Sequence, residues 1–297
     1  MNPPPASALK EHESGPLTAP DTGAVPTWVI VVLVGAPTLL ILLIMSGFLG
    51  VIGSGPLIRF PQILVANTPT GGDMGAHVLL PQVLRDVLLP SGRIFGWSST
   101  WYAGVPALYF YFPIPALVTV LLDVLLPYGV AFKLVTIVGL VALPVATYAF
   151  VRLLGFSRSV SGLASLTGSM FVFMESFSIF GANIKSTLAG EFSFSWSFAL
   201  SILYLGIISR DTRLGRRFTP LAGVVLAMTA LTHIVSTLIV VAVSVALLCR
   251  RNGPRTVFSS WVLGFALSAF WALPLGIRFL QGMATDMGWA AVTNVVG

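Results

Sequence analysis

The sequence predicts an all-α polytopic membrane protein, and three observations carry this prediction. Of its 297 residues, 56% are hydrophobic and only 9% are charged, and the mean hydropathy is +0.94. A soluble domain needs roughly 25% charged residues to cover its surface, so most of this surface must face lipid. Several apolar runs approach the length of about 20 residues that a helix needs to cross a bilayer. Arginines gather in the short connections between these runs, so the net charge of +6 indicates membrane orientation and no nucleic-acid partner.

Seven apolar runs are the predicted spans. They cover residues 28–51, 130–151, 160–180, 192–208, 220–232, 235–248 and 257–280. An eighth run, 114–126, is short and follows Pro113, so it can either cross the membrane or lie along its surface. The polar, Pro-rich segment 1–26 is predicted to be a disordered cytoplasmic tail, because it lacks the apolar stretch of a signal peptide.

Three arginine clusters decide most of the topology. They are Arg152 with Arg158, then Arg210, Arg213, Arg216 and Arg217, then Arg250, Arg251 and Arg255. All three lie on one side if the helices alternate, and that side is predicted to be cytoplasmic. If run 114–126 lies on the surface, the chain has seven spans and its long first loop is outside. If it crosses, there are eight spans and the loop is inside. Helix length favours the first solution and the count of basic residues favours the second.

The long loop between residues 54 and 113 is unusually aromatic. It contains Trp97, Trp101, Tyr102, Tyr109, Phe110, Tyr111 and Phe112, which need burial or a membrane interface. Helical spacing of the apolar residues over 74–89 and 114–126 predicts two short helices at the interface, the first kinked at Pro81.

Asp73 follows Gly71 and Gly72 and precedes the first of these helices. A carboxylate at that position can cap the helix, because it is favoured by the free amides and by the helix dipole. His77 lies four residues later and shares the same helix face. Such a pair can be a base with its orienting group, half of a metal site, or a simple surface pair. The spacing leaves these alternatives open.

The order of the sequence elements adds a resemblance. One span is followed by a large loop with the Gly71-Gly72-Asp73 turn, the segment Trp101-Tyr102-Ala103-Gly104, and Tyr111-Phe112-Pro113-Ile114-Pro115. A predicted interfacial helix and a helix ending in Arg152-Leu153-Leu154-Gly155 come next. This order resembles the GT-C superfamily of integral membrane glycosyltransferases. Within it, the chain is most similar to the bacterial membrane-protein family described as related to 6-pyruvoyl-tetrahydropterin synthase.

The resemblance spans about residues 28–280 and implies a topology. It implies a GT-C-like module of about seven transmembrane helices over 27–280 in the plasma membrane, with a cytoplasmic N-terminus. Residues 54–129 would then form an external loop with juxtamembrane helices, which decides for seven spans. We expect 281–297 to be an external segment that continues into a further C-terminal region.

The resemblance also implies an activity. A sugar would pass from a polyprenyl-phosphate donor to a glycan, lipid or protein acceptor of the cell envelope, on the outer face. Asp73 matches the loop acid that acts as base or places a metal, with His77 beside it. Glu191 matches a second acid, Lys185 would bind phosphate, and His233 matches a position often filled by His. A divalent cation, Mg²⁺ or Mn²⁺, would be the cofactor, but the loop has no Asp-x-Asp pair, so its ligands are unknown.

Other interpretations of the same residues stay open. Lys185 and Glu191 can be an interfacial anchor and a helix cap, and His233 can be solvated at a hairpin tip. The aromatic residues Trp97, Trp101 and Tyr102 can either stack on sugar rings or anchor the loop at the membrane interface. The alternative function is a non-catalytic GT-C-like protein that handles envelope lipids or glycans. A transporter would show inverted repeats, which we do not find, and the oligomeric state is open.

Overall fold

The computed structural model describes residues 25–49, 56–100, 104–174 and 181–280, and these are mostly helical. Within this part of the chain, four helical segments are long and apolar enough to cross a membrane. They are α1 (Thr27–Met45), α4 (Tyr128–Leu153), the continuous segment Ile184–Arg213, and α10 (Gly253–Leu280). The prediction of a mostly helical chain is confirmed, and four of its helical segments have the length and apolar composition that a membrane span needs.

The other predicted spans also form helices, but shorter ones. They are α5 (Arg158–Val172), α8 (Pro220–Thr232) and α9 (Ile234–Ser244), with 15, 13 and 11 residues, and the last continues as the 3₁₀ helix η5 (Val245–Cys249). A helix of about 20 residues is needed to cross the hydrocarbon core alone. The count of seven spans therefore stays a prediction.

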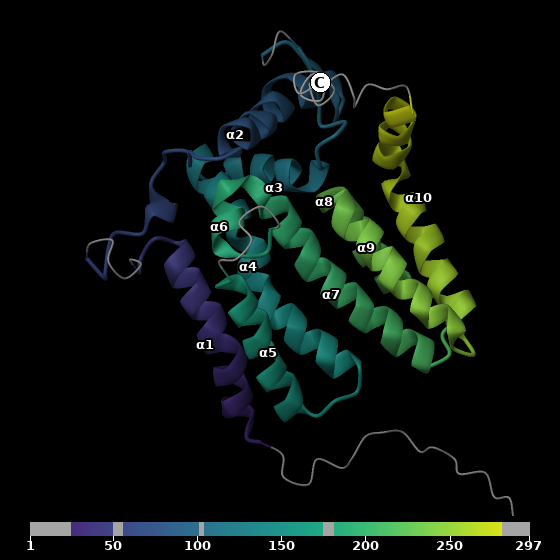
Figure 1. Cartoon of the computed structure of the whole chain (residues 1–297). Helices are drawn as coiled ribbons and strands as arrows, with labels where there is room; N and C mark the ends of the chain where they lie inside the picture. Colours follow the sequence, from purple (N-terminus) through teal and green to yellow (C-terminus); the bar gives the residue numbers. More distant parts are fainter. Residues whose placement is uncertain (1–24, 50–55, 101–103, 175–180, 281–297) are drawn as a thin grey trace, which may run out of the picture.

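The long segment Ile184–Arg213 has three parts. It begins with the short helix α6 (Ile184–Ser186), passes through the π-helical turn η4 (Thr187–Glu191) and continues as α7 (Phe192–Arg213). Helix α7 packs against α4 and α8, while α1 packs against α4 and α5 and α8 packs against α10 (Figure 1). Close approach is possible because Gly139 of α4 faces the backbone of Ser195 and leaves no room for a side chain.

The arginine-bearing connections meet at one end of this bundle, which we call the arginine end. Arg213, at the end of α7, donates from Nη2 to the carbonyl oxygen of Leu153 at the end of α4, at 2.6 Å. Thr256, in the first turns of α10, donates to the carbonyl oxygen of Arg216 in the α7–α8 connection. The three clusters therefore gather as the alternation of helices predicted.

The long loop covers the opposite end, which we call the loop end (Figure 1). It forms η1 (Gln62–Leu64), α2 (Met74–Val83), η2 (Leu84–Leu88), η3 (Leu89–Ser91) and α3 (Pro113–Asp123). Both predicted loop helices are thus present. Pro81 lies inside α2 and the π-helical turn η2 follows it, which fits the hydrogen bond that proline removes. The antiparallel hairpin of β1 (Gly96–Ser98) and β2 (Val105–Ala107) was not predicted.

Helix α4 connects the two ends. Its 26 residues correspond to about 39 Å of helix. In its first turns Lys133 donates from Nζ to the carbonyl oxygens of Gln62 and Val65, both at 2.6 Å, and to Oδ1 of Asn67 at 3.0 Å. One ammonium group thus holds the start of the loop against the bundle.

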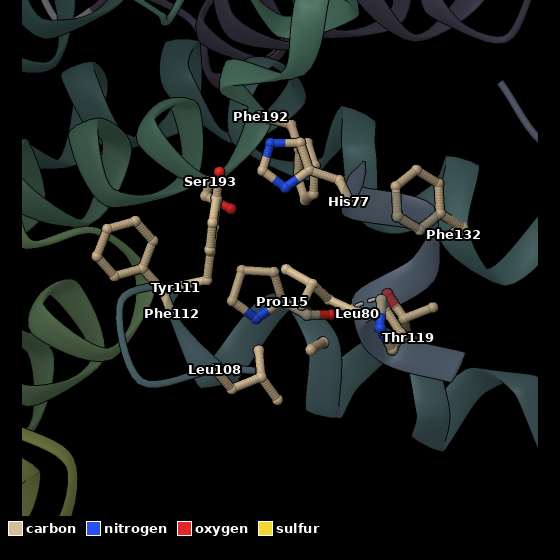
Figure 2. A pocket seen from close by; sticks show the side chains of 12 residues that line it. His77, Leu80, Leu108, Tyr111, Phe112, Pro115, Thr119, Phe132, Phe192 and Ser193 are labelled. Atoms are coloured by element: carbon tan, nitrogen blue, oxygen red, sulfur yellow. Dashed lines mark hydrogen bonds between the residues drawn. The ribbon is translucent and has the colours of Figure 1, made fainter. Parts of the chain in front are cut away.

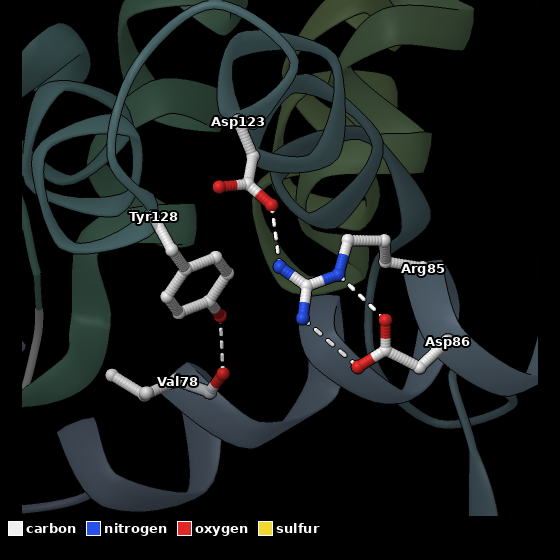
Figure 3. Close-up of polar contacts among 5 residues, drawn as sticks. All are labelled: Val78, Arg85, Asp86, Asp123 and Tyr128. Atoms are coloured by element: carbon white, nitrogen blue, oxygen red, sulfur yellow. Dashed lines mark hydrogen bonds and ion pairs between the residues drawn. The ribbon is translucent and has the colours of Figure 1, made fainter.

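Ion pairs hold the loop helices to each other, as Figure 3 shows. The guanidinium of Arg85 donates to both carboxylate oxygens of Asp86, at 2.7 and 2.9 Å, and to Asp123 at the end of α3, at 2.5 Å. The hydroxyl of Tyr128 donates to the carbonyl oxygen of Val78. These contacts join α2, α3 and α4 at a single corner.

Helix α10 holds the end of the aromatic loop. The indole of Trp271, which is 1% exposed, donates to the carbonyl oxygen of Leu108 at 3.0 Å. The guanidinium of Arg278 lies 3.9 Å from the ring centroid of Tyr109 and donates to its hydroxyl at 3.2 Å. The loop is therefore packed on the bundle, as its many aromatic residues predicted.

Candidate functional site

Asp73 lies at the N-cap position of α2, yet its side chain makes no capping hydrogen bond. Its backbone N–H donates instead to the carbonyl oxygen of Ala189, at 2.8 Å. Gly71 and Gly72 have φ of +103° and +50°, conformations that suit glycine and let the chain turn into the helix. Asp73 therefore occupies the predicted N-cap position without a capping side-chain hydrogen bond, and its exposed carboxylate is available for other contacts.

Two glycines bring the loop into contact with the π-helical turn η4. A Cβ on Gly72 would lie 2.1 Å from the carbonyl oxygen of Ala189, so only glycine fits there. Gly190 has a φ of +129°, and a Cβ on it would lie 3.0 Å from Cβ of Asp73 and 3.3 Å from Cδ2 of His77. Asp73 and His77 therefore share one face of α2, as predicted, and this face lies on Gly190.

Glu191 follows Gly190 and is half-buried. It occupies the predicted N-cap position of α7, again without a capping side-chain hydrogen bond. Burial raises the pKa of the nearby Tyr111 hydroxyl, and the charges of Asp73 and Glu191 raise it further. Two carboxylates and one phenol from three separate segments thus meet at the loop end.

His77 is half-buried among aromatic rings. Its ring centroid lies 5.3 Å from that of Tyr111 and 5.2 Å from that of Phe192, both edge to face. Burial lowers the pKa of His77 from 6.5 to about 4, although the charge of Asp73 opposes this shift. The imidazole is therefore neutral at pH 7, with one nitrogen that donates and one that accepts a hydrogen bond.

A small cavity of about 20 Å³ lies beside His77, and Figure 2 shows its lining. In this view His77 and Phe192 lie above Pro115 and Leu108. The cavity has room for about one water molecule and not for a sugar ring. Any larger ligand of Asp73 must therefore bind on the exposed side of the carboxylate, or the loop must open.

His233 breaks the helix between α8 and α9, where its φ is −165° and its ψ is 123°. The ring centroid lies 4.4 Å from that of Phe112 and 5.2 Å from that of Phe194. Its Nδ1 is buried and has no hydrogen-bond partner among the residues that the structure describes. The interpretation of His233 as solvated at a hairpin tip is therefore wrong, and Phe112 connects it to Tyr111 and the cluster.

Two other predicted site residues that the structure describes, Lys185 and Trp97, do not line the cavity beside His77. Lys185 is exposed on the short helix α6. Trp97 lies in β1 with 61% of its side chain exposed, against the backbone of Gly104, and does not line the cavity beside His77. Trp101 and Tyr102 lie outside the described residues.

Over the described ranges, no three His, Cys, Asp or Glu side chains are grouped to hold a metal ion. Mg²⁺ commonly binds through one or two carboxylates together with substrate phosphates and water. Asp73 and Glu191 fit that limited role, so a divalent cation stays a prediction tied to a bound phosphate.

Sequence reasoning did not select Tyr111, Phe112 or Gly190 as site residues. The two aromatic residues were predicted to need burial or a membrane interface, but their contacts with His77 and His233 join distant segments. Gly190, in Ala189-Gly190-Glu191, offered the one usable signal, because a glycine next to a candidate acid can mark a close backbone approach.

Comparisons with protein-family models, with curated proteins and with solved structures found no match to this chain.

Proposed function

We propose that this protein is a plasma-membrane glycosyltransferase that takes a sugar from a polyprenyl-phosphate donor. One observation carries the proposal: Asp73, which does not cap its helix, lies with Glu191 and the neutral His77 at one end of an apolar helical bundle. Neither carboxylate makes a capping hydrogen bond. Asp73 could therefore act as the base in a group transfer, with Glu191 as the second acidic residue of the site.

The GT-C arrangement of seven spans is part of this proposal. Helices α1, α4, α5, α7, α8, α9 and α10 would cross the membrane in alternation. Helix α3 packs against α4 and α8 at the loop end, beside α2, which supports a juxtamembrane position (Figure 1). Because α4 separates the loop end from the arginine end, the positive-inside rule then places the Asp73 site outside.

An apolar cavity supports a lipid-linked donor. It has a volume of about 680 Å³ and is lined by residues of α1, α4, α7 and α8, among them Leu42, Val138 and Leu203. Trp196 also lines it, and packs against the cluster containing Phe192, whose ring contacts His77. A polyprenyl chain held in this cavity would end near the candidate site.

The proposed reaction is an inverting transfer. The carboxylate of Asp73 accepts the proton of an acceptor hydroxyl as the hydroxyl oxygen bonds to the anomeric carbon. The bond from that carbon to the phosphate oxygen breaks, and polyprenyl phosphate leaves with its electron pair. Lys185, or a divalent cation held by Asp73 and Glu191, would stabilise the departing phosphate.

A specific observation favours the second candidate, a non-catalytic protein that handles envelope lipids or glycans. The cavity beside His77 holds only about one water molecule. In this alternative, Asp73 and Glu191 bind a ligand on the surface without activating it.

The two candidates differ in product formation. The purified full chain in lipid nanodiscs would be incubated with a panel of polyprenyl-phosphate hexoses and pentoses and with envelope extract as acceptor. Release of polyprenyl phosphate would be measured. We expect Asp73→Asn to lower release at least about 100-fold, with the melting temperature unchanged. Asp86→Asn removes a loop carboxylate held by Arg85 and should keep wild-type release. Full release by Asp73→Asn would contradict the assigned base.

A further inference from the structure

A second cavity lies at the arginine end, on the opposite side of the bundle from Asp73. It has a volume of about 420 Å³ and is formed by three segments. Its lining is Leu154, Gly155 and Phe156 of the α4–α5 turn, Ser209, Thr212 and Arg213 of α7, and Leu247 and Arg250 near the end of α9. The cavity thus joins three connections that are distant in the sequence.

The positive charge of this cavity is not neutralised by the acid nearest in sequence. The carboxylate of Asp211 pairs with Arg210 at 2.8 Å and with Arg216 at 3.3 Å, and also accepts from the hydroxyl of Thr219 at 2.6 Å. Arg213 donates to a backbone carbonyl oxygen instead. Neither Arg213 nor Arg250 forms an ion pair with another described residue.

The backbone at Gly155, in the α4–α5 turn, leaves room for the guanidinium of Arg213. Gly155 has a φ of +96°, and a Cβ on it would lie 2.6 Å from Nη1 of Arg213. Only glycine therefore lets the guanidinium lie against the α4–α5 turn. A guanidinium fixed in this way presents its remaining N–H groups in a fork that suits two phosphate oxygens.

Thr212 contributes a buried hydroxyl beside this cavity. Thr212 lines the cavity with only 3% of its surface exposed, and its Oγ1 has no hydrogen-bond partner in the described part of the chain. A buried hydroxyl without a partner is costly, but Oγ1 of Thr212 is covered by the protein, so Thr212 belongs to the wall of the cavity and is not a ligand.

Exposed apolar side chains beside the cavity favour an amphiphilic ligand. Phe156, in its lining, is 51% exposed, and Leu214, next to Arg213, is 61% exposed. A cationic cavity at the ends of apolar helices, flanked by exposed apolar side chains, fits a headgroup with acyl chains better than a soluble anion. We propose that this cavity binds the phosphate of an anionic phospholipid through Arg213 and Arg250, and so ties three helix connections together.

Lipid counting by native mass spectrometry tests this proposal on the full chain. The protein would be purified in detergent and titrated with phosphatidylglycerol, with phosphatidylcholine as the zwitterionic comparison. We expect one saturable phosphatidylglycerol per chain. Arg213→Gln and Arg250→Gln should each weaken it at least about tenfold. Thr212→Val changes the wall without removing charge, so it should keep the affinity within about twofold of wild type, and it should not lower the melting temperature because valine leaves no unsatisfied hydroxyl.

Arg158→Gln is the matched control, because Arg158 lies at the same end and does not line the cavity. Arg158→Gln removes the same charge as the two cavity variants. It should weaken binding by less than about fivefold, because it removes only the non-specific attraction of one basic residue to anionic lipid. An equal loss in Arg158→Gln would overturn the proposal in favour of diffuse attraction. Binding of phosphatidylcholine with equal affinity would overturn it too. Displacement of the lipid by an equal concentration of inorganic phosphate would show a site for free phosphate and reject the lipid.

Discussion

Gly190 is the position where one added methyl group tests the geometry of the candidate site most sharply. In Gly190→Ala the new Cβ would lie 3.0 Å from Cβ of Asp73 and 3.3 to 3.4 Å from the ring of His77. These contacts are closer than ordinary packing, so α2 must shift by a few tenths of an ångström. The φ of +129° adds a backbone cost of about 1–2 kcal/mol. We expect a loss of about 1–3 kcal/mol in the free energy of unfolding.

The same shift should affect turnover. A displacement of about 1 Å at a reacting group can cost roughly 100-fold in rate. The smaller shift of α2 expected in Gly190→Ala should therefore lower polyprenyl-phosphate release about tenfold. Chemical unfolding and release would both be measured in nanodiscs. Gly92→Ala is the matched control, because Gly92 has a φ of +68° and nothing lies within 4 Å of a Cβ there. It should lose about 1 kcal/mol of stability and no activity. Wild-type release by Gly190→Ala, or an equal loss in Gly92→Ala, would refute the reasoning.

Two further predictions concern the loop. The carboxylate of Asp123 is 12% exposed and that of Asp86 is 56% exposed, and both pair with Arg85. Asp123→Asn should lower the free energy of unfolding by about 1–2 kcal/mol, and Asp86→Asn by less than about 0.5 kcal/mol; equal losses would contradict the ion-pair assignment. The pKa of His77 is lowered from 6.5 to about 4, so between these pH values the unfolded chain binds a proton that the folded chain does not. The free energy of unfolding should therefore fall as the pH is lowered from 6.5 to about 4, by at most about 3 kcal/mol. If a His77→Gln variant shows the same dependence on pH, protonation of His77 is not its cause.

The helices could be predicted from the sequence because each apolar run must satisfy its own backbone groups. Long apolar runs therefore predicted α4, α7 and α10. The arginines near the ends of α4 and α7 correctly indicated that these two helix ends lie at the same end of the bundle. Helix α3 was ambiguous in sequence, since a run of this length can cross or lie flat. Its packing against α4 and α8 supports the second position.

The candidate site could be predicted only in part. Asp73 and His77 are four residues apart, so helix geometry alone placed them together. Their contact with Gly190 joins segments far apart in the chain and depends on a π-helical turn, which leaves no periodic signal in the sequence. The hairpin around Trp97 was missed for a similar reason, because strands of three residues are too short to show alternation.

In the topology proposed above, the Asp73 site and the arginine end lie on opposite faces of the membrane. It is tested directly by labelling intact cells with a membrane-impermeant thiol reagent. Single cysteines would replace Ser91 in the loop or Asn252 at the arginine end, both exposed, in a Cys249→Ser background. We predict labelling at position 91 in intact cells and at position 252 only after permeabilisation. Labelling at position 252 with protection at position 91 would put Asp73 in the cytoplasm and contradict the proposed external glycosyltransferase.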